Sequence, residues 1–194
     1  MRHARFSGLF ITAAEQLADW MTKQLPDNFP RFESQSRKQM KDVELVAGLL
    51  LLIEEGIGGY SQDDLDKAFS DRDVEWEDAA DTEQRFREVT DFVNQLVQLP
   101  DQDPLLRSRL RNQADFYSLF GAINELIDIV DPAISESKDI LASRLRSFVE
   151  IVDDEVRRIR DEAATRYLNA ARSNSNDLGQ RKQRVETITT VLRG

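Results

Sequence analysis

The sequence predicts an all-α protein: a single irregular bundle of about seven helices around a buried central helix. Apolar residues recur every three or four positions through most of the chain, and no segment shows the strict alternation of a half-buried strand. The 194 residues include only 5 Pro and 8 Gly, too few for a chain of many tight turns. Charged residues make up 32% and apolar residues 40%, a balance typical of charge-rich helical proteins.

The first helix is predicted from Leu9 to Leu25, where apolar residues follow helical spacing. Ser7 is the expected N-cap, and Pro26 is expected to end the helix.

The segment from Arg37 to Glu55 predicts the central helix. Leucines also cover the faces beside its main apolar face, and a helix that is apolar nearly all round is buried. The main face consists of Met40, Val43, Val46, Ala47, Leu50 and Ile53.

Ser61 and Asp64 have the spacing of a capping box, which predicts a short helix from Gln62 to Phe69. An acidic linker follows. We expect residues 1–194 to form a single helical domain, with 71–82 as the place where a subdivision would fall. Trp76, within that linker, is expected to pack onto the core.

The rest of the chain predicts further helices separated by prolines or by a polar turn. Their apolar residues again recur at helical spacing. We expect helices over 86–99 and 116–130 and one long helix over 140–167. A last helix is expected to include Val185, Ile188 and Leu192.

The acidic charge of the chain is local. The formal net charge is −10, and residues 54–91 alone contain 14 acidic and 4 basic residues. The remainder has 22 of each, so the overall charge argues neither for nor against nucleic acid as a partner.

The residue content excludes several kinds of site. There is no Cys, which excludes disulfides and thiolate chemistry, and the single His, His3, lies outside every predicted helix, which argues against a di-iron bundle. A calcium-binding loop around Asp71 is disfavoured, because Trp76 stands where such a loop needs Gly and Thr82 where it needs Glu. We therefore predict no catalytic set, no metal site and no cofactor.

Three basic clusters are the remaining candidates for binding. If they met on one face, they would form a strip that binds phosphates weakly and without sequence preference. The alternative is that these residues pair with the many carboxylates around them. The clusters are Arg37, Lys38 and Lys41; Arg107, Arg109 and Arg111; and Arg181, Lys182 and Arg184.

Four segments, taken in order, resemble the helical C-terminal region of GmrSD-type proteins, of the ParB/sulfiredoxin-like nuclease superfamily, which includes modification-dependent restriction and phage-defence proteins. The resemblance covers most of the chain, and it rests on the order and spacing of segments that are individually loose. The segments are RHARFSG (2–8), KQMKDVELVAGLLLLIE (38–54), RNQADFYSLFGAI (111–123) and NSNDLGQRKQRVETI (174–188).

The resemblance implies particular roles for these residues. Arg2, Arg5 and Phe6 would form the junction that follows the catalytic domain of the family. Lys41 would open the central helix, with Asp42 and Glu44 fixing nearby loops or bases. The Arg-rich last helix of the family would correspond to Arg181 and Arg184.

The catalytic signature of the family, Asp-Gly-Gln-x-Arg, does not occur in the sequence. The resemblance therefore implies a helical region without its catalytic domain. We expect the chain to be either an excised piece or the product of a split or truncated gene.

Two functions remain open at this point. The first is a non-catalytic accessory domain that supports or docks a ParB-like nuclease domain, in cis or as a separate subunit, and touches the DNA backbone. The second is an independent helical adaptor or inhibitor whose acidic segment, 54–91, binds a basic protein. We expect a cytoplasmic location and no membrane partner, because no apolar signal region is visible and the longest apolar run, 45–53, is too short to span a bilayer.

Overall fold

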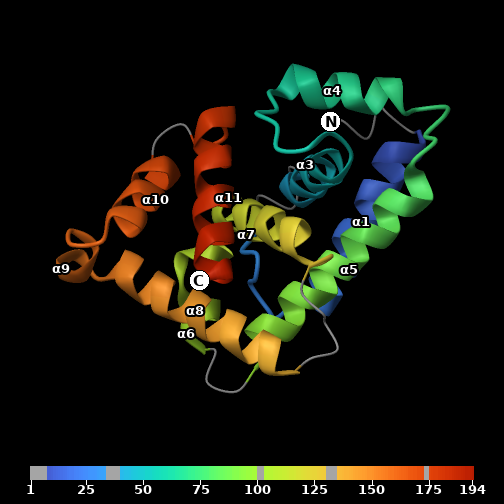
Figure 1. Cartoon of the computed structure of the whole chain (residues 1–194). Coiled ribbons are helices and arrows are strands. Elements are labelled where there is room, and N and C mark those ends of the chain that lie inside the picture. Colours follow the sequence, from blue (N-terminus) through green and yellow to red (C-terminus); the bar gives the residue numbers. More distant parts are fainter. Residues whose placement is uncertain (1–7, 34–39, 100–102, 130–134, 173–174) are drawn as a thin grey trace.

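The computed structural model describes residues 8–33, 40–99, 103–129, 135–172 and 175–194. These residues form ten α-helices and one 3-10 helix and contain no strand, which confirms the all-α prediction (Figure 1). The helices are α1 Leu9–Gln24, α3 Lys41–Glu55, α4 Gln62–Asp71, α5 Ala79–Val97, α6 Asp103–Arg107, η2 Arg109–Arg111, α7 Gln113–Leu126, α8 Ser135–Asp153, α9 Glu155–Arg158, α10 Glu162–Arg172 and α11 Leu178–Arg193.

The predicted central helix is buried, but it shares the centre of the molecule with α7. In α3, every residue from Val46 to Leu52 is buried. In α7, every residue from Asp115 to Ile123 is buried, although its sequence suggested only one apolar face. Helix α7 packs against α3, α5 and α11 and crosses the middle of the fold (Figure 1).

Gly121 allows this close packing. A Cβ atom at this position would lie 3.1 Å from a methyl group of Val185 on α11 and 3.2 Å from one of Leu52 on α3. Larger side chains at 121 would therefore push these helices apart.

Helices α1, α3 and α5 pack against one another, and α4 packs against α3 (Figure 1). The N-cap of α1 is Gly8; the expected cap, Ser7, lies outside the described residues. The predicted capping box of α4 is present. The Asp64 backbone N–H donates to Ser61 Oγ over 3.2 Å, and the Ser61 N–H donates to the Asp64 carboxylate over 2.8 Å.

The expectation of one long helix over 140–167 is wrong. Helix α8 ends at Asp153, and the short α9 separates it from α10. The Asp154 side chain accepts hydrogen bonds from the backbone N–H groups of Val156 and Arg157, so it caps a new helix instead of continuing the old one.

The acidic linker is fixed to the end of α3. Trp76 is buried, as predicted, and its indole N–H donates to Glu54 over 2.6 Å. Thr82 donates to the same carboxylate oxygen, and Arg72 binds the other oxygen through two nitrogens. The linker segment that was considered as a calcium loop is thus bound to the end of α3 through the hydrogen bonds to Glu54.

One apolar cluster includes side chains from before and after this linker, among them Phe10 of α1 and Phe86 of α5. None of the helices in the described part of the chain combines the length and apolar character needed to span a bilayer.

Candidate functional site

Arg109, one of the predicted phosphate ligands, is engaged inside the protein. Its guanidinium makes two 3.1 Å hydrogen bonds to Asp115, whose carboxylate also accepts from the Tyr167 hydroxyl over 2.7 Å. Burial lowers the pKa of Arg109, and the bonds to Asp115 outweigh that effect and raise it. For this residue the structure matches the alternative of pairing with a carboxylate.

Arg184 is also internal, and it is fully buried. It donates to the Ser118 hydroxyl and to the backbone carbonyls of Ala114, Ala170 and Ser175, over 2.7–3.3 Å. Arg184 therefore does not lie on the surface that the conditional phosphate strip would need; its hydrogen bonds join α11 to α7 and to the end of α10.

Arg181 lies at a pocket. Its guanidinium carbon lies 4.2 Å from the ring centre of Tyr117 and 5.8 Å from that of Tyr60, and one nitrogen donates to the Gly58 carbonyl over 2.8 Å. These contacts hold the guanidinium plane in place.

The other predicted residues are more scattered. Arg107 and Lys182 are exposed, and Arg111 is half-buried. Lys41 forms an ion pair with Glu44 over 2.8 Å, and the Asp42 carboxylate accepts from the Val43 N–H. Among the described residues, the basic clusters therefore do not act as one strip. Arg2, Arg5, Phe6, Arg37 and Lys38 lie outside the described residues.

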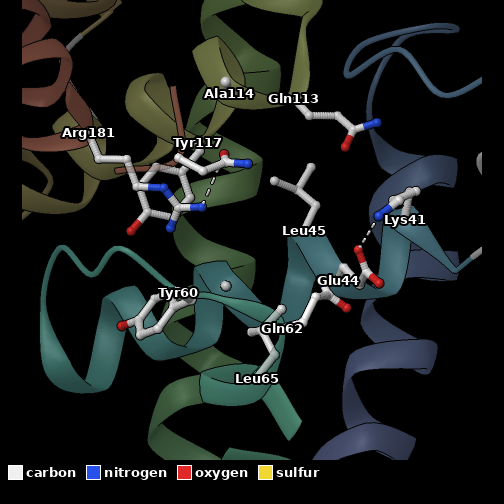
Figure 2. Close-up of a pocket in the computed structure, with 12 residues that line it drawn as sticks. Lys41, Glu44, Leu45, Tyr60, Gln62, Leu65, Gln113, Ala114, Tyr117 and Arg181 are labelled. Carbon is white, nitrogen blue, oxygen red and sulfur yellow. Dashed lines mark hydrogen bonds and ion pairs between the residues drawn. The ribbon is translucent and has the colours of Figure 1, made fainter. Parts of the chain in front are cut away.

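The site that the structure does assemble is a pocket of about 170 Å³, here called the junction pocket. Figure 2 shows Arg181 and Tyr117 on one side of it, Lys41 and Glu44 on the other, and Leu45 between them. Its lining is Lys41, Glu44, Leu45, Gly48, Tyr60, Gln62, Leu65, Gln113, Ala114, Tyr117, Asn176 and Arg181.

Three of the four segments singled out in the sequence meet at the junction pocket. Segment 38–54 contributes four lining residues, segment 111–123 contributes three, and segment 174–188 contributes two. The remaining lining residues come from the start of α4 and the tyrosine before it. The segments are far apart in the chain, and only the packing of α3, α7 and α11 brings them together.

The tyrosines of the junction pocket are hydrogen-bond donors at neutral pH. Burial raises the pKa of Tyr60, and the neighbouring Tyr117 and Glu55 raise it further. Burial likewise raises the pKa of Tyr117, against the opposing effect of Arg181. Phenols that stay protonated are poor general bases, so the tyrosines of the pocket are not suited to abstraction of a proton.

The described residues contain no cluster of three or more His, Cys, Asp or Glu side chains placed to hold a metal ion. Among the residues that line the junction pocket, Glu44 is the only carboxylate, and it forms an ion pair with Lys41. Within that lining, it is not paired with a nucleophile that it could activate as a general base. The arrangement is suited to binding.

Sequence reasoning found Lys41 and Arg181 but missed the other polar groups of the pocket. Tyr117 lies in a helix predicted from its apolar spacing, and its own residue type did not distinguish it there. Gln113 and Asn176 carry no charge and stood out only as members of longer segments. The signal that could have found them is their shared position at helix starts.

No family model matches the chain, and no curated protein or solved structure matches it either.

Proposed function

We propose that the chain is a non-catalytic accessory domain of a GmrSD-type DNA-restriction or defence system, which docks a ParB-like nuclease domain in cis or as a separate subunit. The observation that supports this proposal is the meeting of three resemblance segments at the junction pocket. Segments of one family that share a role are expected to lie close together in the folded protein. Segments that resemble the family only by chance are not expected to do so.

The chemistry of the junction pocket supports a binding role for the chain. Its polar groups are two cations, one carboxylate, three amides and two phenols, with no nucleophile beside a base. Nuclease activity of the complete system would then come from the partner domain.

Co-purification tests the docking. The chain and the ParB-like nuclease domain of a GmrSD-type protein are expressed with separate tags and analysed by size-exclusion chromatography. We expect a single complex, and no complex when an unrelated acidic helical protein replaces the chain. Separate elution, together with no heat of binding in calorimetry, would contradict the proposal.

An activity assay tests the non-catalytic role. The purified chain, incubated with modified or unmodified DNA, nucleoside triphosphates and Mg²⁺, is expected to give no turnover. Turnover that disappears when one carboxylate of this chain is substituted would show that the chain is itself an enzyme.

A second candidate function is binding of a basic protein through the acidic segment 54–91. Glu75, Glu77, Asp78 and Asp81 are exposed at its centre, and no ion pair joins them to another described residue. A variant with all four changed to Asn or Gln distinguishes the two functions, because it should abolish binding of a basic partner and leave docking of the nuclease domain intact.

A further inference from the structure

We propose that the junction pocket binds a phosphoryl group, either inorganic phosphate or the terminal phosphate of a nucleotide strand. This inference concerns the isolated chain and does not depend on the nuclease partner. It rests on the charges of the lining, on the helix starts that surround it, and on its size.

Two cations line the junction pocket. The Lys41 ammonium forms an ion pair with Glu44 over 2.8 Å, and the Lys41 side chain is 42% exposed. An ammonium group has three N–H donors, so Lys41 can also donate to a ligand. Arg181 uses one nitrogen on the Gly58 carbonyl and another, at 3.4 Å, on Asn176. A guanidinium has five N–H groups, so donors remain for a ligand. With Glu44 as the only carboxylate, the lining has one positive charge in excess.

A further donor at the pocket is uncommitted. The side-chain amide of Gln113 makes no hydrogen bond to any other described residue, and Figure 2 shows it on the side of the pocket where Lys41 lies. An amide group can donate to one oxygen of a phosphate while the cations hold the others.

The pocket is surrounded by the first turns of four helices of at least ten residues. Lys41, Gln62 and Gln113 are the first residues of α3, α4 and α7, and Arg181 lies in the first turn of α11. The N-termini of helices favour anions, because their dipoles and unpaired N–H groups add to the charge of nearby cations.

Three of these helix starts lack an ordinary side-chain cap. The side chains of the N-cap residues, Met40 of α3, Asn112 of α7 and Asp177 of α11, accept no hydrogen bond from the helices that they precede. Only α4 has a capping side chain, that of Ser61. These helix starts are thus not capped by hydrogen bonds from their N-cap side chains, although carboxylates lie close to them: Asp42 and Glu44 in the first turn of α3, Asp115 in that of α7, and Asp177 itself before α11.

The size of the pocket limits the ligand. Its 170 Å³ is below the range of roughly 300–1,000 Å³ that is usual for sites of drug-sized molecules. A phosphoryl group fits this volume, whereas a nucleotide base and sugar would have to remain outside.

Calorimetric titration with sodium phosphate tests the proposal, with sodium acetate and sodium chloride at matched ionic strength as controls. We expect saturable 1:1 binding of phosphate and none of chloride. Absence of saturable phosphate binding would overturn the proposal. Binding of acetate as tight as that of phosphate would also overturn it, because the site would then be one for carboxylates.

Two variants locate the site, and a third is their matched control. Lys41→Met and Gln113→Leu should each weaken phosphate binding, Lys41→Met by at least about tenfold. Lys182→Met removes an exposed cation next to Arg181 and should leave binding unchanged. Thermal unfolding of each variant is measured to check that the variant is folded. Equal losses in Lys41→Met and Lys182→Met would overturn the assignment, because the effect would then be one of general charge.

Oligonucleotides with and without a 5′-phosphate identify the source of the phosphoryl group. Preferential binding of the phosphorylated strand, in competition with inorganic phosphate, assigns the terminal phosphate of a strand. Binding of inorganic phosphate alone assigns the free ion. Equal binding of both strands that phosphate does not compete away would contradict the proposal, since the contacts would then be with phosphodiesters elsewhere on the surface.

Discussion

Arg184 is a cation whose partners are a hydroxyl and three backbone carbonyls rather than a carboxylate. Burial lowers its pKa, and the nearby Tyr167 and Asp115 act in the opposite direction. A guanidinium presents five donors in a fixed plane, so one side chain can satisfy carbonyls from several elements. Its role in this fold is to join helices.

Replacement of Arg184 by Met should therefore destabilise the protein by about 3–5 kcal/mol, because the buried acceptors lose their donor. Chemical denaturation measures the free energy of unfolding. Lys182→Met, an exposed substitution on the same helix, is the control and should change that free energy by less than about 0.5 kcal/mol. Similar effects of the two substitutions would show that the Arg184 bonds contribute nothing specific.

At the scale of elements, side chains at helix ends decide where helices begin and how linkers are held. Asp154 begins α9 where the apolar pattern would have continued α8. Ser61 and Asp64 begin α4, and Glu54 at the end of α3 holds the linker through Arg72 and Trp76. Two predictions belong to this scale.

Glu54→Ala should lower the free energy of unfolding by about 2–4 kcal/mol, since Trp76 and Thr82 lose their acceptor and Arg72 keeps only Glu55 as a carboxylate partner. Glu55→Ala is the matched control. The Glu55 side chain is 50% exposed, and its loss should cost less than about 1 kcal/mol. A result in which Glu55→Ala is the more damaging change would contradict the proposed role of Glu54.

The capping box of α4 makes a contribution to stability that depends on pH. Side-chain and backbone hydrogen bonds from Ser61 hold the pKa of Asp64 below its ordinary value of 3.8. A carboxyl whose pKa is lower in the folded state stabilises that state above its unfolded pKa, and this contribution is lost as the pH falls through the folded pKa. The stability difference between the natural chain and Asp64→Ala should be largest at neutral pH and should shrink below about pH 4. Thermal unfolding from pH 7 to pH 2 measures it, and a difference that stays constant over this range would show that ionised Asp64 is not the cap.

At the scale of the whole molecule, the distribution of charge limits what the protein can bind. The acidic segment 54–91 carries an excess of ten negative charges, whereas three of the predicted phosphate ligands, Arg109, Arg181 and Arg184, have partners within the fold. An extended contact with a DNA backbone is therefore disfavoured.

We expect duplex DNA to bind no more tightly than the roughly 10⁻⁴–10⁻⁶ M that is typical of non-specific binding at physiological salt, with steep weakening as salt rises. Fluorescence anisotropy at two salt concentrations checks this. Lys182→Glu and Arg111→Glu should weaken any binding seen at low salt. Sub-micromolar affinity at physiological salt, or a preference for one sequence, would contradict the docking role.

How far the candidate site could be predicted depends on the residue. Lys41 and Arg181 were singled out by charge within segments of the resemblance, and both line the junction pocket. Tyr117 was not predicted as a pocket residue, because helical periodicity does not separate a buried ring from one that also borders a pocket. For Arg184 the sequence left a surface position and an internal one open, because a charged residue is almost never fully buried unless it is paired, and the sequence does not display the carbonyls that pair with it.

The sequence by itself determined the all-α class, the capping box of α4, the burial of Trp76 and the apolar faces that form the core. These features depend on residues a few positions apart or on the apolar character of a single segment, which a sequence displays directly. The tertiary structure decided that α7 shares the centre with α3, that Arg184 is internal, and that α3, α4, α7 and α11 start around one pocket. Each of these depends on contacts between segments more than fifty residues apart, and such contacts follow from how helices pack and which buried polar groups they must satisfy.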